Sequence, residues 1–177
     1  MPTYVAFLRG INLGPAKKVS MPRLRELAEG LGYTDVRTYI NSGNLILTTT
    51  DAAATIEQRL SEAIADDLGH RVDVAVRTPA RLATIVAENP FPDGDPTYVT
   101  VAFLTNAVPT DAKRRVAEVA TEKEPYVFAG QEVYVHYTDG QARSKLAARF
   151  SDIIGVSATV RNLRTVTKVL QLAQRDE

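Results

Sequence analysis

The same order of strand-like and helix-like segments runs through this chain twice. Short runs of β-branched and aromatic residues predict strands, and apolar residues at helical spacing predict helices. Each half reads strand, helix, strand, strand, helix, strand, followed by one extra helix. Val-Arg-Thr at 76–78 and Val-Arg-Asn at 160–162 close a strand at the matching place in each half. The order therefore predicts two tandem units built on one plan.

In the first half, cap and turn residues mark the ends of the expected elements. Ser20 is a favoured N-cap, and Gly30 and Gly32 end the helix that follows it. Asn-Ser-Gly-Asn at 41–44 separates two strand-like runs and predicts a hairpin turn. The expected elements are a strand at 4–8, a helix at 20–31, strands at 36–40 and 45–49, a helix at 51–68, a strand at 72–78 and a helix at 78–86.

Residues 89–96, with three prolines and a glycine, predict a linker because they disfavour both a helix and a central strand. The second half follows this linker. Its expected elements are a strand at 98–104, a helix at 110–119, a hairpin at 126–137 around Gly130, one helix with Leu146, Phe150, Ile153 and Ile154 on one face, a strand at 157–160 and a last helix from 162.

This order is the ferredoxin-like, or split βαβ, plan, in which helices cover one face of an antiparallel sheet. We predict an α+β protein with two tandem ferredoxin-like (βαββαβ) units, each with an extra helix. The first unit is expected over 1–88 and the second over 97–177, on either side of the 89–96 linker. A doubly wound α/β fold is the alternative, but the two tight hairpins argue against an all-parallel sheet.

Composition narrows the classes of function. The chain of 177 residues is 45% hydrophobic and 24% charged, which is typical of a globular protein, and its formal net charge of zero argues against bulk attraction to nucleic acid. It contains no cysteine, which excludes disulfides and thiol chemistry, and His70 and His136 are far apart in sequence. We therefore expect no metal, and we expect no cofactor. The apolar runs are strand-sized and no basic, then apolar, leader follows Met1, so we also expect no membrane segment and a cytoplasmic location.

The loop from Leu8 to Ser20, LRGINLGPAKKVS, is longer and more basic than a simple connection needs. In the predicted topology this loop, the 41–44 turn and the loop around His70 and Arg71 share one edge of the first sheet. The first two of these loops supply what we call the first-loop rim. Its residues are Arg9, Gly10, Asn12, Gly14, Lys17, Lys18, Asn41, Ser42, Gly43 and Asn44.

The first-loop rim has the chemistry of an anion site. Backbone N–H groups of a glycine-bearing loop, and the helix N-terminus that it enters, attract an anion. Arg9 can clamp such a group with two hydrogen bonds, and a lysine adds charge. The alternative interpretation is structural: Gly10 and Gly14 supply backbone angles that other residues resist, and 41–44 is a good turn without any ligand.

A second candidate patch lies at the end of the chain, where Arg143 to Lys168 holds six basic residues against Asp152 alone. On a helix from Asn162, an apolar stripe leaves Arg161, Arg164, Lys168 and Arg175 within about 60° on the opposite face. We call these neighbours the C-terminal patch: Arg161, Asn162, Arg164, Thr165 and Lys168. A solvated helix face is the alternative interpretation.

Residues 7–44, FLRGINLGPAKKVSMPRLRELAEGLGYTDVRTYINSGN, closely resemble the opening of the bacterial family catalogued as domain of unknown function 1697. VRNLRTVTKVLQL at 160–172 resembles its closing motif. The resemblance spans nearly the whole chain and implies a duplicated ferredoxin-like arrangement, but it implies no activity and no catalytic residue. It marks Arg9, Gly10, Asn12, Gly14, Lys18, Ser42, Gly43, Asn44, Arg161, Asn162, Thr165 and Lys168.

Three positions depart from the pattern that the resemblance implies. Pro15 stands where a further glycine is usual, Asn41 where glutamine is expected, and Leu163 where tryptophan is expected. Pro15 also removes one backbone donor from any anion cradle at that position.

Three hypotheses of function follow, and the sequence does not decide whether the chain is an enzyme. The first is binding of a phosphate- or carboxylate-bearing small molecule at the first-loop rim. The second is an acylphosphatase-like hydrolase, by fold analogy alone. The third is an interaction domain for nucleic acid or protein that uses the basic C-terminal helix.

Overall fold

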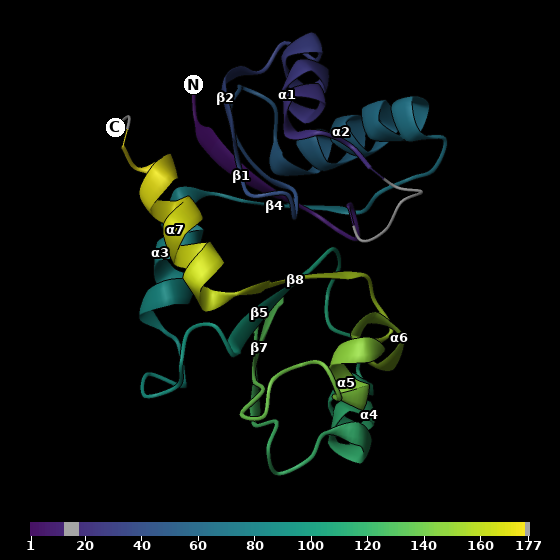
Figure 1. The fold of residues 1–177 in the computed structure, drawn as a ribbon, viewed down its shortest axis with the longest axis vertical. Helices are drawn as coiled ribbons and strands as arrows, with labels where there is room; N and C mark the ends of the chain where they lie inside the picture. Colours follow the sequence, from purple (N-terminus) through teal and green to yellow (C-terminus); the bar gives the residue numbers. More distant parts are fainter. Residues whose placement is uncertain (13–17, 176–177) are drawn as a thin grey trace. The chain divides into compact units, whose positions relative to one another are not determined.

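Two four-stranded antiparallel sheets form the framework of the protein (Figure 1). The structure, a computed structural model, describes residues 1–12 and 18–175. The chain divides into two units. The first contains Met1–Thr84 and the chain from Lys168, and the second contains Ile85–Thr167.

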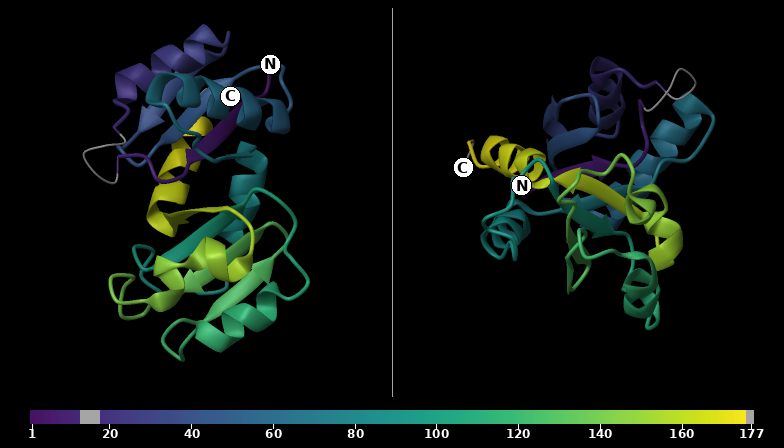
Figure 2. Two further views of the ribbon diagram at one scale, coloured as in Figure 1. Left: turned by 90° about the vertical axis from the view of Figure 1, so that its right-hand side faces the viewer. Right: turned by 60° about the horizontal axis from the view of Figure 1, so that its bottom comes forward.

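In the first unit, β1 is a central strand that pairs antiparallel with β3 on one side and β4 on the other. The strand order is β2-β3-β1-β4. The helices α1 and α2 lie together on one face of this sheet (Figures 1 and 2). The elements are β1 (Thr3–Leu8), α1 (Met21–Gly30), β2 (Thr34–Tyr39), β3 (Asn44–Thr48), α2 (Ala53–Leu68) and β4 (Val74–Arg77).

Local sequence explains these elements. The Ser20 side chain accepts a hydrogen bond from the Arg23 N–H and caps α1, as expected. Alternate residues of each strand face the helices, so Ala6 and Leu8 of β1 are buried against apolar side chains of α1 and α2. The core on this face includes Leu24, Ala28, Leu45, Leu47, Ile56, Leu60, Ile64, Val74 and Val76.

The second sheet has the equivalent order, β6-β7-β5-β8, with β5 as the central strand. Helices α4, α5 and α6 pack on one another beside it (Figures 1 and 2). The remaining elements of the chain are α3 (Pro79–Ala87), β5 (Val99–Leu104), α4 (Ala112–Val119), β6 (Tyr126–Ala129), β7 (Glu132–His136), α5 (Lys145–Ala148), α6 (Phe150–Ile154), β8 (Ala158–Asn162) and α7 (Leu163–Ala173).

The single helix expected around Leu146 and Ile154 is two short helices, because Arg149 leaves helical geometry at φ −128° and ψ 28°. Leu146, Phe150 and Ile154 are nevertheless all buried in the second core. The apolar spacing continues across the break, so the sequence pattern cannot reveal it.

The units differ from the expected ranges of 1–88 and 97–177. The division falls inside α3 and α7, and residues 89–96 lie within the second unit. In the first unit, the Arg37 guanidinium of β2 donates to the Leu172 carbonyl of α7 at 3.0 Å. In the second, the Tyr134 hydroxyl of β7 donates to the Ile85 carbonyl of α3 at 2.7 Å. Each extra helix thus ends in a different unit from the one in which it begins.

Arg115 of α4 holds the end of α6, so its loss should destabilise the second unit. Its guanidinium donates to the carbonyls of Ile153 and Ile154 at 2.6 and 2.7 Å and pairs with Asp111. We expect Arg115→Met to lower the free energy of unfolding by about 2 kcal/mol, because two carbonyls lose charged donors. Urea unfolding measures this change.

The neighbouring Arg114 provides the control, since it is mostly exposed and pairs only with Asp111 and Glu118 among the interactions of the described residues. Arg114→Met should cost less than about 1 kcal/mol. Equal losses for the two variants would contradict the assigned role of Arg115.

Glu57 of α2 should make stability depend on pH. Its carboxylate accepts the Val76 N–H at 2.8 Å, and burial raises its pKa above the ordinary 4.5, against the smaller opposing effects of that bond and of Arg77. The folded state therefore holds the proton more readily than the unfolded chain, and stability falls as the pH rises from 4.5 through the raised pKa.

We expect Glu57→Gln, which keeps an oxygen for Val76, to melt above the wild type at neutral pH and to lose that advantage in acid. Melting temperatures from about pH 4 to about pH 8 test this. Glu62→Gln, at an exposed position of the same helix, is the control. A difference between Glu57→Gln and the wild type that stays constant over this range would contradict the assignment.

Candidate functional site

Three loops of the first unit meet where β1 ends. The Leu8 N–H donates to the Gly43 carbonyl in the β2–β3 turn, and the Arg9 N–H donates to the Asp73 carbonyl before β4, each at 2.9 Å. The Asn12 side chain donates to the Asn41 carbonyl at 2.8 Å. The expected strand order requires this juxtaposition, and the structure contains it.

Asn12 joins two of these loops, the first loop and the β2–β3 turn. Its amide oxygen accepts the Val19 N–H at 3.0 Å, and its amide nitrogen donates to the Val19 carbonyl at 3.0 Å as well as to Asn41. Its backbone adopts the left-handed region at φ 58°, which asparagine tolerates better than most residues. The polar atoms of Asn12 therefore serve the architecture of the first-loop rim.

The turn residues are also used internally. Asn44 is fully buried, and its amide donates to the Tyr39 carbonyl at 2.8 Å and to the Ser42 hydroxyl at 3.0 Å. Gly43 has φ 82°, and a Cβ there would lie 2.5 Å from Cδ1 of Ile11. Only glycine fits this close approach, so Gly43 and the buried Asn44 build the turn.

Among the rim residues that the structure describes, the accessible charges lie on Arg9 and Lys18. The Arg9 side chain is 45% exposed, and its guanidinium pairs with Asp73 at 3.5 Å. Lys18 is exposed, as is Arg71 in the neighbouring loop, and His70 is half-buried. Gly10 has φ 66°, which supports its expected role in shaping the backbone. Gly14 and Lys17 lie outside the described residues.

Ile40 is a feature that the sequence analysis missed. The sequence pattern predicts a strand over 36–40, whereas β2 ends at Tyr39 and Ile40 has φ 50° with 51% of its surface exposed. This backbone region is unfavourable for a β-branched residue, and such strain tends to occur at functional sites. No local signal distinguishes Ile40 from a strand residue, since isoleucine is itself a favoured strand residue.

The C-terminal patch is not a continuous ridge on a helix. Pairing of β8 with β5 extends through Arg161 and Asn162, so α7 begins only at Leu163. Burial lowers the pKa of Arg161 to about 10, and its guanidinium donates to the Val160 carbonyl. The Asn162 side chain accepts the Thr165 N–H at 2.9 Å.

The other members of the C-terminal patch differ in exposure. Thr165 is buried, Lys168 is half-buried and Arg164 is exposed. Arg164 and Lys168 therefore lie on α7, as expected, whereas Arg161 lies on β8, because the strand continues further than the apolar pattern suggested.

Within residues 1–12 and 18–175, no group of three or more His, Asp or Glu side chains is placed to hold a metal ion. No described helix is both long enough and apolar enough to cross a membrane.

Removal of the Asn12 side chain should loosen the rim. We expect Asn12→Ala to lower the free energy of unfolding by about 2–3 kcal/mol, because it removes three hydrogen bonds and strains the left-handed backbone. Asn12→Gly, which relieves the strain but not the loss of bonds, should be intermediate. Asn41→Ala keeps the accepting carbonyl and should change stability little. Urea unfolding that ranks Asn41→Ala with Asn12→Ala would contradict this role.

Comparison with known proteins places the chain in a family. A solved structure described as that of the conserved bacterial protein SP0830 from Streptococcus pneumoniae has a TM-score of 0.78 and 23% sequence identity, with 99% of each chain covered, and thus shares the fold. No curated protein matches the chain. The family model described as "Protein of unknown function (DUF1697)" matches residues 1–134. The chain therefore belongs to the DUF1697 family, whose resemblance was visible in its opening loop and hairpin.

Proposed function

We propose that the protein binds a small molecule bearing a phosphate or carboxylate at the first-loop rim. The observation that supports this most is the position of Arg9 and Lys18 in the first loop, which Asn12 ties to the β2–β3 turn and the Arg9 N–H ties to the loop before β4. Because these loops are already held together, the backbone needs no ordering when an anion binds, and the entropy cost is limited to the side chains.

The geometry divides the rim residues into two roles. Asn12, Gly43 and Asn44 hold the loops, as their internal contacts indicate. Arg9 and Lys18 contact the anion in our proposal. Arg71 is an exposed cation two residues before Asp73, the partner of Arg9, and adds positive charge near the site. Ser42 and Asn41 border this surface, and Gly14 and Lys17 remain part of the proposal from sequence alone.

Asp73 is the competitor of the ligand for Arg9. Both side chains are close to half exposed and their charged atoms are 3.5 Å apart. Ion pairs of this kind contribute only about 0–1 kcal/mol. A phosphate that accepts two hydrogen bonds from a guanidinium interacts more strongly, so the pair with Asp73 does not prevent binding.

We also infer that both units are ferredoxin-like and arose by internal duplication. The equivalent orders β2-β3-β1-β4 and β6-β7-β5-β8, with antiparallel neighbours throughout, support this inference. Acyl phosphates belong to the proposed ligand class, so hydrolysis at the rim remains a prediction by analogy. A cytoplasmic location likewise remains a prediction.

Two substitutions with opposite effects test the proposal. We expect inorganic phosphate, acetyl phosphate or acetate to bind the wild type, and Arg9→Ala to weaken that binding at least about tenfold. Asp73→Asn should strengthen binding, because it removes the competing carboxylate but keeps Arg9. Isothermal titration calorimetry measures both affinities. Arg149→Ala, which removes an exposed charge in the second unit, is the control.

A structural role of Arg9 alone predicts a different result. Arg9→Ala and Asp73→Asn would then lower the melting temperature alike, since each breaks the same ion pair, and neither would change the affinity for any anion. That result would overturn the proposed function.

A further inference from the structure

The second unit has longer loops than the first at the opposite end of its sheet. In the first unit, residues 31–33 join α1 to β2 and residues 49–52 join β3 to α2. The equivalent connections of the second unit are residues 120–125 and 137–144. Extra loop length between equivalent elements is where a scaffold commonly acquires a site.

Side chains close this end of the first unit. Arg59 pairs with Asp51 at 2.6 Å and donates to the Leu31 carbonyl at 2.8 Å. The Tyr33 hydroxyl donates to Asp51 at 3.3 Å, and the Arg59 guanidinium lies over the Tyr33 ring. These contacts tie the two short loops together.

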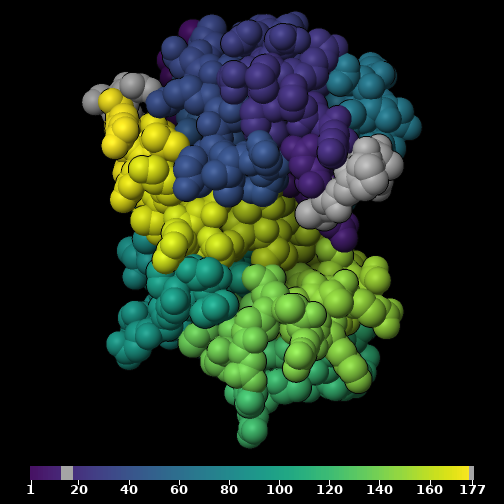
Figure 3. All heavy atoms as spheres, in the orientation of Figure 1, coloured from purple at the N-terminus to yellow at the C-terminus, as the bar shows by residue number. Residues whose placement is uncertain are grey.

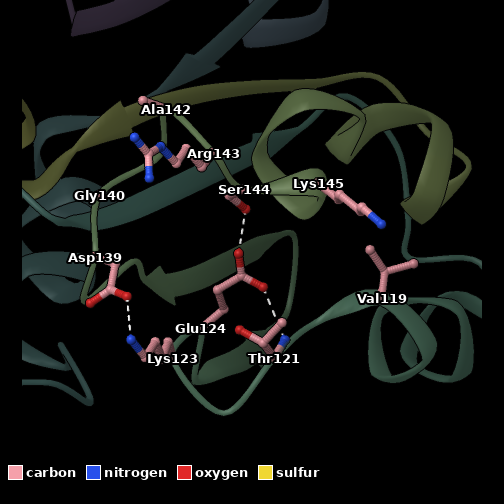
Figure 4. Close-up of a pocket in the computed structure, with 10 residues that line it drawn as sticks. All are labelled: Val119, Thr121, Lys123, Glu124, Asp139, Gly140, Ala142, Arg143, Ser144 and Lys145. Atoms are coloured by element: carbon pink, nitrogen blue, oxygen red, sulfur yellow. Dashed lines mark hydrogen bonds and ion pairs between the residues drawn. The ribbon is translucent and has the colours of Figure 1, made fainter.

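In the second unit, the corresponding loops enclose a pocket of about 550 Å³ (Figure 4). This volume lies in the range of small-molecule sites. The light-green atoms of the segment that follows β7 lie at the molecular surface in Figure 3, so a solute can reach this region. The pocket shares no residue with the first-loop rim.

A buried carboxylate lies between the two loops. Glu124 is only 8% exposed, and its carboxylate accepts the Thr121 N–H at 2.9 Å and the Ser144 hydroxyl. The Ser144 oxygen in turn accepts the Ala147 N–H at 3.0 Å. In the described part of the chain, Glu124 forms no ion pair. Its remaining lone pairs suit a hydrogen-bond donor on a ligand.

Two cations flank Ser144, the residue whose hydroxyl donates to this carboxylate. Figure 4 shows Arg143 on one side of Ser144 and Lys145 on the other. Both side chains are exposed, and neither forms an ion pair among the described residues. Lys123, in contrast, is neutralised by Asp139 at 2.5 Å. The pocket therefore offers two positive charges near its loop and one buried acceptor.

We infer that this pocket binds a small polyhydroxylated anion, a phosphate or carboxylate ester or acid that also carries hydroxyl groups. Arg143 and Lys145 pair with its charged group. Glu124 accepts a hydrogen bond from a hydroxyl, and Ser144 keeps the carboxylate in place. An anion without hydroxyl groups gains only the first contact, and a neutral polyol gains only the second.

Glycerol phosphate, inorganic phosphate and glycerol are the probes, titrated into the full chain by calorimetry. We expect glycerol phosphate to bind at least about tenfold more tightly than phosphate at this pocket, and glycerol not to bind measurably. The double variant Arg143→Ala with Lys145→Ala should lose at least about tenfold of the affinity for glycerol phosphate. Both positions are exposed, so the fold should be retained, and the melting temperature verifies this.

Glu124→Gln tests the second contact. It should reduce the preference for glycerol phosphate over phosphate while the variant still binds phosphate. Arg9→Ala removes phosphate binding at the first-loop rim, so the glycerol phosphate binding that remains in this variant should be lost when Arg143→Ala and Lys145→Ala are added, which separates this inference from the proposed function. Lack of glycerol phosphate binding, or binding that only Arg9→Ala weakens, would overturn the inference.

Discussion

The pairing of β1 with a strand on each side determines where the loops of the first unit meet. Phe7 lies opposite Asn44 of β3, and Leu8 lies opposite Val74 of β4. Because both neighbours are antiparallel, the end of β1 lies beside the starts of β3 and β4. The first loop, the hairpin turn and the loop before β4 therefore share an edge, and Asn12 can reach Asn41 and Val19. The backbone positions of Arg9 and Lys18 therefore depend on this pairing.

The same constraint acts in the second unit, with a different outcome. The Leu104 N–H donates to the Gln131 carbonyl and the Thr105 N–H to the Ser157 carbonyl, as Leu8 and Arg9 do in the first unit. The connection after β5 is shorter, however, and the added loop length lies at the opposite end, around Glu124. The same strand order thus occurs with two different candidate sites. The first-loop rim lies at the end of the first sheet where β1 ends, and the Glu124 pocket lies at the opposite end of the second sheet.

Much of the fold could be predicted because its signals are local. Asn-Ser-Gly-Asn and the run around Gly130 indicated hairpins, and alternating apolar residues indicated strands, so the α+β class and the antiparallel sheets were confirmed. The unit to which each end of α3 and α7 belongs could not be predicted. It depends on contacts between residues far apart in sequence, such as the hydrogen bond from Tyr134 to Ile85. The extent of β8 was misjudged because Arg161 and Asn162 pair with β5, which apolar spacing does not reveal.

The sequence could predict that the loops of the first-loop rim lie at one edge of the sheet, but it could not predict the contacts that each rim residue makes. The sequence predicts Asn12 and Asn44 as ligand contacts, whereas the Asn12 amide bonds the distant Asn41 carbonyl and the Asn44 amide bonds Tyr39 and Ser42 within the hairpin. The Arg9–Asp73 pair and the Glu124–Ser144 pair join residues on separate elements, so neither leaves a local signal. The most direct test is to titrate phosphate into the double variant Arg143→Ala with Lys145→Ala and to monitor the backbone amide resonances by NMR. The double variant lacks the two cations of the second pocket, so the shifts report on the first-loop rim. The account predicts saturable shifts at Arg9, Gly10, Lys18 and Asp73, and shifts absent from these amides would contradict it.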